Sequence, residues 1–433
     1  QAPEKAFSSL TNVDMDFGTI STPEGERPLS QSTYGSLMIH RDRGVRERTY
    51  RTFYRVFDGH KHTLSTLYEG SVQQDIYEAN VRGYPSTRAM ALFPDKVPEE
   101  VYDNLIETVH ENLPTLQRYY ELRRKALGVE TLAHWDVYVP MVGDISTDYP
   151  YERAVDTIYE ALAPLGDVYR DTLRAGLFDR WVDRYENKGK RSGAFSAGSY
   201  DGDPYILMNY KRDVLRDLFT LAHEGGHSMH SWYSARNNPF QHYSYTIFEA
   251  EVASTFNEQL TARYLFDHAD DERMQAYIIN KQVDDFVATV FRQTMFAEFE
   301  HLTHKMAEEG TPLTLETLRK TYRRLLTTYF GSDVQIPEEG DLEGLRIPHF
   351  YRAFYVYKYA TGLSASVSLS NRVMDGGEKE REQYIEFLKS GGSRFPLESL
   401  QVAGVDMSSP EPIRSAMSSF TQQVEQLESF LLK

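Results

Sequence analysis

The segment His223-Glu224-Gly225-Gly226-His227, within residues 218–259, decides how the rest of the chain is interpreted. Two histidines four residues apart lie on one face of a helix, so both imidazoles can bind one metal ion. The glutamate between them lies close enough to that ion to take a proton from a water molecule bound there. An apolar helical stripe without proline precedes the motif, formed by Val214, Leu215, Leu218, Leu221 and Ala222. This stretch therefore predicts a helix that carries a zinc site.

A zinc ion with two histidine ligands needs a third protein ligand and keeps one position open for water. The metzincin arrangement is excluded, because its further glycine and histidine positions hold His230 and Tyr233. A glutamate on a following helix is the other common solution, and Glu251 and Glu258 are two helical turns apart on a shared face. We predict Glu251 as the ligand and Glu258 as a carboxylate that orients a ligand histidine. His230 is the rival third ligand; otherwise we expect it to form hydrogen bonds that support the site.

Several motifs carry a resemblance to a known family. The segments 223–227 and 251–254 follow the patterns His-Glu-x-Gly-His and Glu-x-x-Ser/Thr. Segments 189–195, 204–210 and 348–351 match as well. With these motifs the sequence resembles oligoendopeptidase F, of the thimet-oligopeptidase-like zinc peptidases, over nearly its whole length. Leucine or phenylalanine is more usual where this chain has its first motif glycine, a departure that leaves the metal ligands alone and alters the pocket wall.

The resemblance implies a mostly α-helical fold with a deep substrate channel and a small β-sheet beside the metal-binding helix. Periodicity in the chain agrees, being largely helical. We also expect a short hairpin near residues 16–25, a strand over 134–140 and an acidic surface loop over 331–344. Extended runs at 193–196 and 205–208, joined by turn-forming residues, predict a β-hairpin directly before the metal helix.

This hairpin begins with Gly193, Ala194 and Phe195, which we predict to bind substrate. An edge strand can pair with an extended peptide through main-chain hydrogen bonds. The alternative is a hairpin with only a structural role. The family resemblance favours the substrate-binding interpretation.

Residues 347–362 form a second candidate for chemistry, because one histidine and several tyrosines gather there. Aromatic stripes usually belong to a core, but buried tyrosine hydroxyls need partners, and neutral donors stabilise the oxyanion of peptide hydrolysis. In the resembled family a histidine and tyrosines on this element serve that purpose. We expect His349 to do so here, with Tyr357 as the favoured tyrosine and Tyr351 and Tyr355 next.

Composition limits the classes of function. The chain has 433 residues and a net charge of −17, from 47 basic and 64 acidic residues, which argues against nucleic acid and anionic membranes. Cysteine is absent, so a zinc site must use histidine and carboxylate ligands. We expect a cytoplasmic protein; its oligomeric state is open.

The chain begins with Gln1, and members of the resembled family carry a further helical segment before this point. We therefore expect an N-terminal remnant over residues 1–30 and a catalytic metallopeptidase domain over 31–433, with the native N-terminal segment missing.

We predict a zinc metalloendopeptidase that hydrolyses internal bonds of short peptides, with Glu224 as the base. One alternative is a helical zinc carboxypeptidase, which needs a basic residue for the substrate carboxylate; Lys190, Arg191 and Arg352 are available. The other is a non-catalytic helical peptide-binding protein. It predicts loss of Glu224, yet that residue is present.

Overall fold

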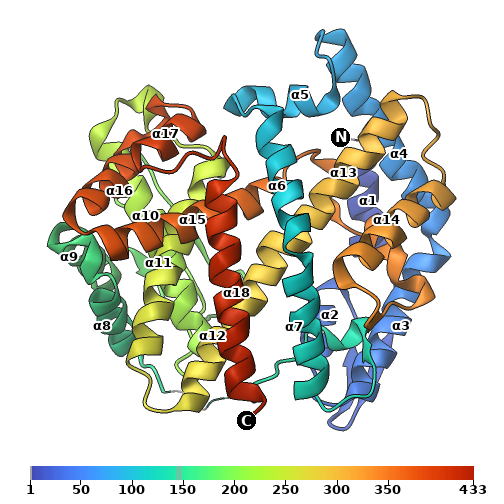
Figure 1. The fold of residues 1–433 in the computed structure, drawn as a ribbon, viewed down its shortest axis with the longest axis horizontal. Coiled ribbons are helices and arrows are strands. Elements are labelled where there is room, and N and C mark those ends of the chain that lie inside the picture. Colours follow the sequence, from blue (N-terminus) through green and yellow to red (C-terminus); the bar gives the residue numbers. More distant parts are fainter. Residues whose placement is uncertain (1, 144, 146–147) are drawn as a thin grey trace.

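The structure is a computed structural model, and it describes residues 2–143, 145 and 148–433. Helices dominate, as predicted, and Figure 1 shows them in two groups with a central set between. One group contains α1 (Ala2–Ser9), α2 (Gln31–Met38), α3 (Arg43–Gly59), α4 (Lys61–Val81), α5 (Thr87–Leu92), α13 (Arg292–Glu308) and α14 (Leu315–Phe330). The other contains α8 (Tyr151–Ala161), α9 (Asp167–Phe178), α10 (Leu215–Asn237), α11 (Ile247–Asp267), α12 (Glu272–Phe286), α15 (Tyr357–Gly376), α16 (Glu378–Ser390) and α17 (Pro396–Val402).

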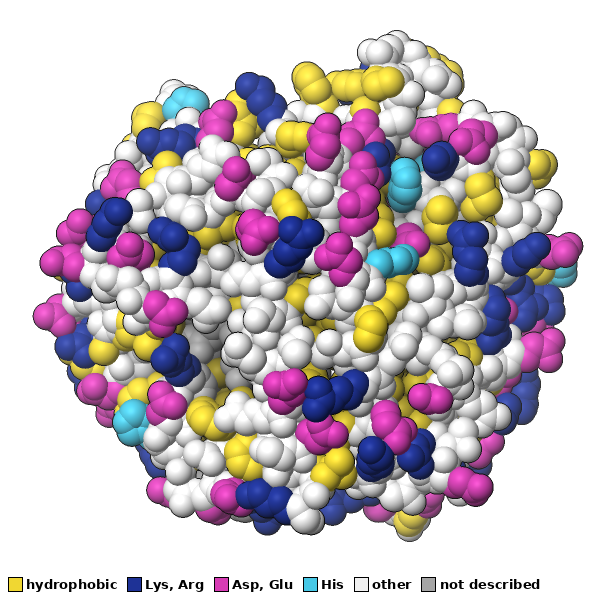
Figure 2. All heavy atoms as spheres, viewed as in Figure 1, with side chains coloured by type: hydrophobic (Ala, Val, Ile, Leu, Met, Phe, Trp, Pro, Cys, Tyr) yellow, Lys and Arg dark blue, Asp and Glu magenta, His cyan; other side chains and the backbone are white. Residues whose placement is uncertain are grey.

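The central set runs down the face seen in Figure 1 and consists of α6 (Glu99–Glu111), α7 (Leu113–Ala126) and α18 (Glu411–Leu431). Short 3₁₀ helices connect many elements, namely η2 (Phe93–Asp95), η3 (His134–Asp136), η4 (Ala163–Leu165), η5 (Phe240–His242), η7 (Glu338–Leu345), η8 (Pro348–Tyr351) and η9 (Gly391–Ser393). Two π-helical turns are η1 (Leu10–Asp14) and η6 (Val287–Phe291). Charged side chains of both signs are scattered over the face in Figure 2. Within the described residues, every helix is too short or too polar to cross a membrane.

Three small sheets accompany the helices. The predicted N-terminal hairpin is confirmed as β1 (Thr19–Thr22) and β2 (Gly25–Pro28), which pair antiparallel. The hairpin predicted before the metal helix is confirmed as β5 (Phe195–Ala197) and β6 (Tyr205–Leu207), also antiparallel. A strand that we did not predict, β4 (Val182–Asp183), pairs parallel to the other side of β6, so β5 lies at an edge of this sheet.

Two predicted segments take other conformations. The strand expected over 134–140 is wrong: strand β3 is Leu132–Ala133, paired parallel with β7 (Val334–Gln335), and residues 134–136 form η3. The acidic surface loop expected over 331–344 is also wrong, because its second half is the buried helix η7. Glu343 is only 1% exposed there, paired with Arg346 at 3.1 Å and with Arg292. Acidic composition suggested solvent, but arginines from other elements neutralise the buried charge.

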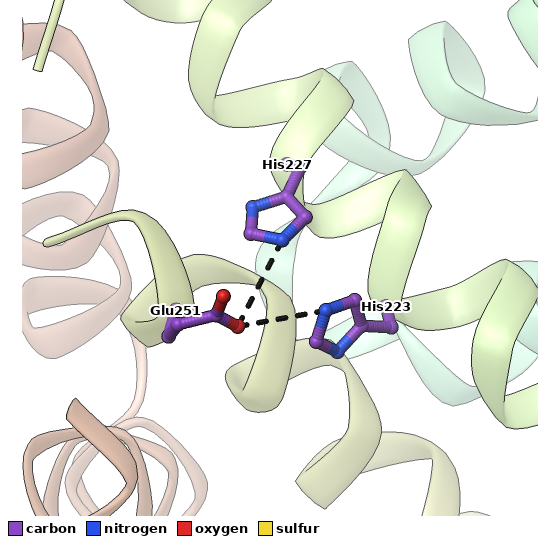
Figure 3. Close-up of side chains that lie close together, drawn as sticks. All are labelled: His223, His227 and Glu251. Atoms are coloured by element: carbon purple, nitrogen blue, oxygen red, sulfur yellow. Dashed lines mark ion pairs between the residues drawn. The ribbon is translucent and has the colours of Figure 1, made fainter. Parts of the chain in front are cut away.

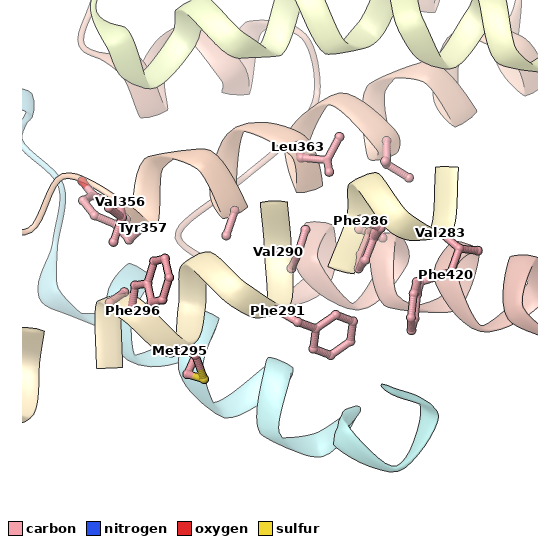
Figure 4. Packing of buried hydrophobic residues seen from close by; sticks show 14 of the residues in the cluster. Val283, Phe286, Val290, Phe291, Met295, Phe296, Val356, Tyr357, Leu363 and Phe420 are labelled. Atoms are coloured by element: carbon pink, nitrogen blue, oxygen red, sulfur yellow. The ribbon is translucent and has the colours of Figure 1, made fainter. Parts of the chain in front are cut away.

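Helices α10, α11 and α15 pack closely because glycines remove side chains between them. A Cβ on Gly226 of α10 would lie 2.4 Å from the carbonyl oxygen of Ala253 on α11. Gly362 of α15 faces the Cβ of Glu251 at 3.5 Å. The large core continues from these helices along α12, η6, α13 and α18, as the close-up in Figure 4 shows. This packing brings the residues of the predicted zinc site onto two adjacent helices.

Candidate active site

The three predicted metal ligands meet between α10 and α11. One ligand atom from each of His223, His227 and Glu251 lies within 4.8 Å of the other two. Glu251 Oε2 is 3.5 Å from His223 Nε2 and 3.8 Å from His227 Nε2, and Figure 3 shows both imidazoles turned toward the carboxylate. Two imidazole nitrogens and one carboxylate are the donor set of many catalytic zinc sites. The residues therefore fit a zinc ion.

Glu258 holds the first histidine from behind. Its Oε1 lies 2.6 Å from His223 Nδ1, which leaves Nε2 directed to the metal position. Lys281 Nζ is 3.5 Å from Glu258 Oε2, and despite burial its charge helps to hold the pKa of Glu258 below the usual range. Burial lowers the pKa of His223, but Glu258 outweighs it and raises that pKa to about 9. The negative field responsible for this shift also favours a cation at the site.

Glu224 lies between the two histidines of the motif and is only 6% exposed. Its Oε2 has no hydrogen-bond partner among the described residues. Burial raises the pKa of Glu224, against the opposing charge of His223 and a hydrogen bond from the backbone of Ser196 in β5. A carboxylate with a raised pKa and a free oxygen beside the metal position can accept a proton and return it.

His230 does not join the metal ligands. Its ring is fully buried and stacks on Tyr245, with ring centroids 3.6 Å apart and planes 8° from parallel. Neither ring nitrogen has a hydrogen-bond partner among the described residues, and burial lowers the pKa of His230 to about 3. The expectation that it forms supporting hydrogen bonds is therefore not met, because aromatic packing surrounds the ring instead.

The tyrosines of the second candidate segment separate into two environments. Tyr357, the favoured one, is fully buried in the core near Tyr102 and Phe248, and Figure 4 shows it among apolar side chains. Tyr351 packs on Phe7, with ring centroids 4.6 Å apart. Neither of these hydroxyl groups has a partner among the described residues. The structure thus places both away from the metal ligands.

His349 is accompanied by Tyr355 and by Tyr359, which we did not select. The His349 ring lies 6.0 Å from that of Tyr355 and 6.1 Å from that of Tyr359. Tyr359 also lines a cavity of about 350 Å³ together with His223 and Glu251. The signal in the sequence was the four-residue spacing from Tyr355 to Tyr359, which sets this pair on another face than Tyr357.

The edge strand lies against the metal helix. Gly193 precedes it with a φ of +87°, and the side-chain amide of Asn209 donates to the Gly193 carbonyl at 2.9 Å. Ser196 Oγ is 2.8 Å from Ser228 Oγ on α10. Phe195 is 46% exposed, and the outer edge of β5 is unpaired within the described residues. This edge is open to an extended peptide beside Glu224.

Comparisons with known proteins extend over the whole chain. The profile of peptidase family M3 matches residues 36–419. The chain is 46% identical to an oligoendopeptidase F homolog of Borreliella burgdorferi, across 98% of this chain and 72% of that protein. It is 45% identical to oligopeptidase PepF of Bacillus subtilis, across 99% of this chain and 64% of that protein. The crystal structure of oligoendopeptidase-F from Enterococcus faecium is similar with a TM-score of 0.82 at 36% identity, covering 99% of this chain and 71% of that one.

Proposed function

This chain belongs to peptidase family M3 and is a metallopeptidase that cleaves oligopeptides; from this premise we propose that its metal is zinc, held by His223, His227 and Glu251. The observation that carries the proposal is the convergence of these three side chains from α10 and α11 within 4.8 Å. Glu258 supports it, since a carboxylate on the rear nitrogen of a ligand histidine is usual in zinc sites.

A zinc ion held there supplies a Lewis acid, which polarises the scissile carbonyl and makes water more acidic. Glu224 takes the proton of the attacking water and delivers it to the leaving amine. His349, Tyr355 and Tyr359 donate hydrogen bonds to the oxyanion that forms on the carbonyl. The role that we predicted for Tyr357 passes to Tyr359, because Tyr359 shares a cavity with the metal ligands.

Substrate binding is assigned to the edge strand. An extended peptide pairs with β5 through main-chain hydrogen bonds, with Gly193, Ala194 and Phe195 at the start of the contact. Main-chain pairing requires little of the substrate side chains, which suits a peptidase of broad range. The cytoplasmic location and the domain boundary near residue 30 stay predictions.

The carboxypeptidase alternative lacks support from the basic residues that it needs. Lys190 Nζ is engaged by Asp183 at 3.0 Å, and Arg352 lies 3.2 Å from Glu4, with a largely exposed side chain. Both guanidinium and ammonium groups are thus committed away from the metal ligands. We therefore keep internal cleavage as the proposed reaction.

Purified protein and a defined peptide mixture test the proposal. We expect one zinc ion per chain and cleavage products that mass spectrometry identifies as internal cuts. Glu251→Ala should lose zinc after dialysis, whereas Glu224→Gln should keep zinc and lose most turnover, because it retains the ligands but not the base.

His230→Ala is the matched control, being on the same helix but outside the metal ligands. It should retain zinc at one per chain. Zinc loss confined to His230→Ala would show that the third ligand is wrongly assigned, and full activity of zinc-loaded Glu224→Gln would refute the mechanism.

A further inference from the structure

A left-handed backbone turn separates His349 from the tyrosines that face it. Phe354 has a φ of +57°, a region that residues other than glycine adopt at an energetic cost. This residue lies between η8, which carries His349, and α15, which begins at Tyr357. The turn reverses the chain, so that His349 stacks on Tyr355 and meets Tyr359 edge to face.

Glu300, a fully buried residue of α13, holds the turn from the core. The backbone N–H of Phe354 donates to Glu300 Oε1 at 3.0 Å in a buried hydrogen bond. The Phe354 ring lies 5.9 Å from that of Tyr102 and 4.8 Å from that of His304. Glu300 Oε2 has no hydrogen-bond partner among the described residues. The mechanism above makes no use of this carboxyl group.

The carboxyl group acts here as an acceptor and not as a charge. Burial and the nearby Asp75 raise the pKa of Glu300 well above its usual range, against the hydrogen bond from Phe354, so that it is uncharged at neutral pH. An amide of the same shape offers the same acceptor oxygen. A hydrocarbon at this position would leave the Phe354 N–H unpaired in the core, which buried backbone groups rarely tolerate.

We propose that Glu300 is a positioning residue, which fixes the Phe354 turn and thereby sets His349 against Tyr355 and Tyr359. The inference rests on the proposed function, since it assumes that these three side chains stabilise the oxyanion. Without the bond to Glu300, the metal ligands on α10 and α11 and the edge strand remain in place. The loss should therefore appear in kcat and not in KM.

Three substitutions of Glu300 separate its acceptor oxygen from its acidity. Glu300→Gln keeps the acceptor and should keep wild-type kcat. Glu300→Leu removes the acceptor, and Glu300→Asp keeps the acid but shortens its reach. Both should lower kcat, on the order of a hundredfold for a displacement of about 1 Å, with zinc content unchanged.

Thr303→Val is the matched control on the same helix. It removes the 2.7 Å hydrogen bond between Thr303 and Tyr68 and leaves Phe354 alone. We expect a lower melting temperature with wild-type kcat. A fall in kcat equal to that of Glu300→Leu would mean that disturbance of α13 in general, and not the turn, affects the rate.

Amide hydrogen exchange at Phe354 measures the same bond without catalysis. Protection should persist in Glu300→Gln and be lost in Glu300→Asp and Glu300→Leu. Wild-type kcat in Glu300→Asp overturns the proposal, as does a large loss in folded Glu300→Gln; the aspartate variant decides if the leucine variant does not fold. A wild-type protein that cleaves no peptide would refute the proposed function alone, since the exchange measurement still tests the turn.

Discussion

At the scale of single residues, Tyr357 and Tyr359 differ in what surrounds their hydroxyl groups. The Tyr359 ring borders the cavity that His223 and Glu251 also line, whereas Tyr357 is buried without a hydrogen-bond partner among the described residues. Tyr359→Phe should therefore lower kcat on the order of a hundredfold and leave KM little changed, since one oxyanion donor is lost. Steady-state kinetics on a short peptide measures both constants.

Tyr357→Phe serves as the control for this change. It should keep the wild-type rate, and its stability to urea should stay equal or rise by about 1 kcal/mol, because an unpaired buried hydroxyl is removed. A strong rate loss in Tyr357→Phe with a wild-type rate in Tyr359→Phe would restore the assignment that the sequence first favoured.

At the scale of elements, two adjacent glycines in α10 test how closely α10 and α11 must pack. A Cβ at position 226 would meet the α11 backbone, at 2.4 Å from the Ala253 oxygen and 2.7 Å from the Ser254 Cα. These atoms cannot move without shifting the helix that carries Glu251. Gly226→Ala should therefore destabilise the fold by about 1–3 kcal/mol, as overpacking does, and weaken zinc binding. Urea unfolding and a zinc titration measure the two effects.

Gly225→Ala is the matched control, one residue earlier in the same helix. Its Cβ would lie 3.3 Å from the end of the flexible Leu173 side chain, which can move aside. The alanine also gains about 1 kcal/mol of helix propensity. We expect zinc binding to be unchanged and stability to be equal or higher. Equal destabilisation by both alanines would contradict the role given to the close helix contact.

At the scale of the whole molecule, stability should depend on a histidine far from the active site. His134 joins three parts of the chain: it lies on η3, its Nδ1 is 2.9 Å from the Tyr50 hydroxyl of α3, and its ring meets Phe330 of α14. Burial lowers the pKa of His134 to about 4. The folded protein therefore holds this ring neutral, while the unfolded chain protonates it near pH 6.5.

Because the folded-state pKa is the lower one, the stabilisation is complete above about pH 6.5 and is lost as the pH falls toward 4. The difference corresponds to about 3 kcal/mol of unfolding free energy. His134→Asn keeps an acceptor for the Tyr50 hydroxyl but does not titrate. Urea unfolding at several pH values should show a smaller loss of stability over this range in the variant. Identical pH profiles would disprove the assignment.

The sequence by itself determined the chemistry of the site, because that chemistry depends on local spacing. Residues 223–227 sit on one helix, where a separation of four residues sets two imidazoles on the same face whatever surrounds the helix. Glu251 and Glu258 were found by the same helical period. The hairpin before the metal helix followed from turn-forming residues between two extended runs, which is again a local signal.

Only the tertiary structure decided which side chains face the site and which face the core. The stripe 351–355–359 presumed one continuous helix, but α15 begins at Tyr357, so the left-handed turn at Phe354 and not the helical period orients the earlier residues. His230 has the composition of a metal ligand, yet Tyr245, from the far side of a loop, covers its ring. Such contacts join residues distant in the chain, and burial depends on these partners and not on neighbours in sequence.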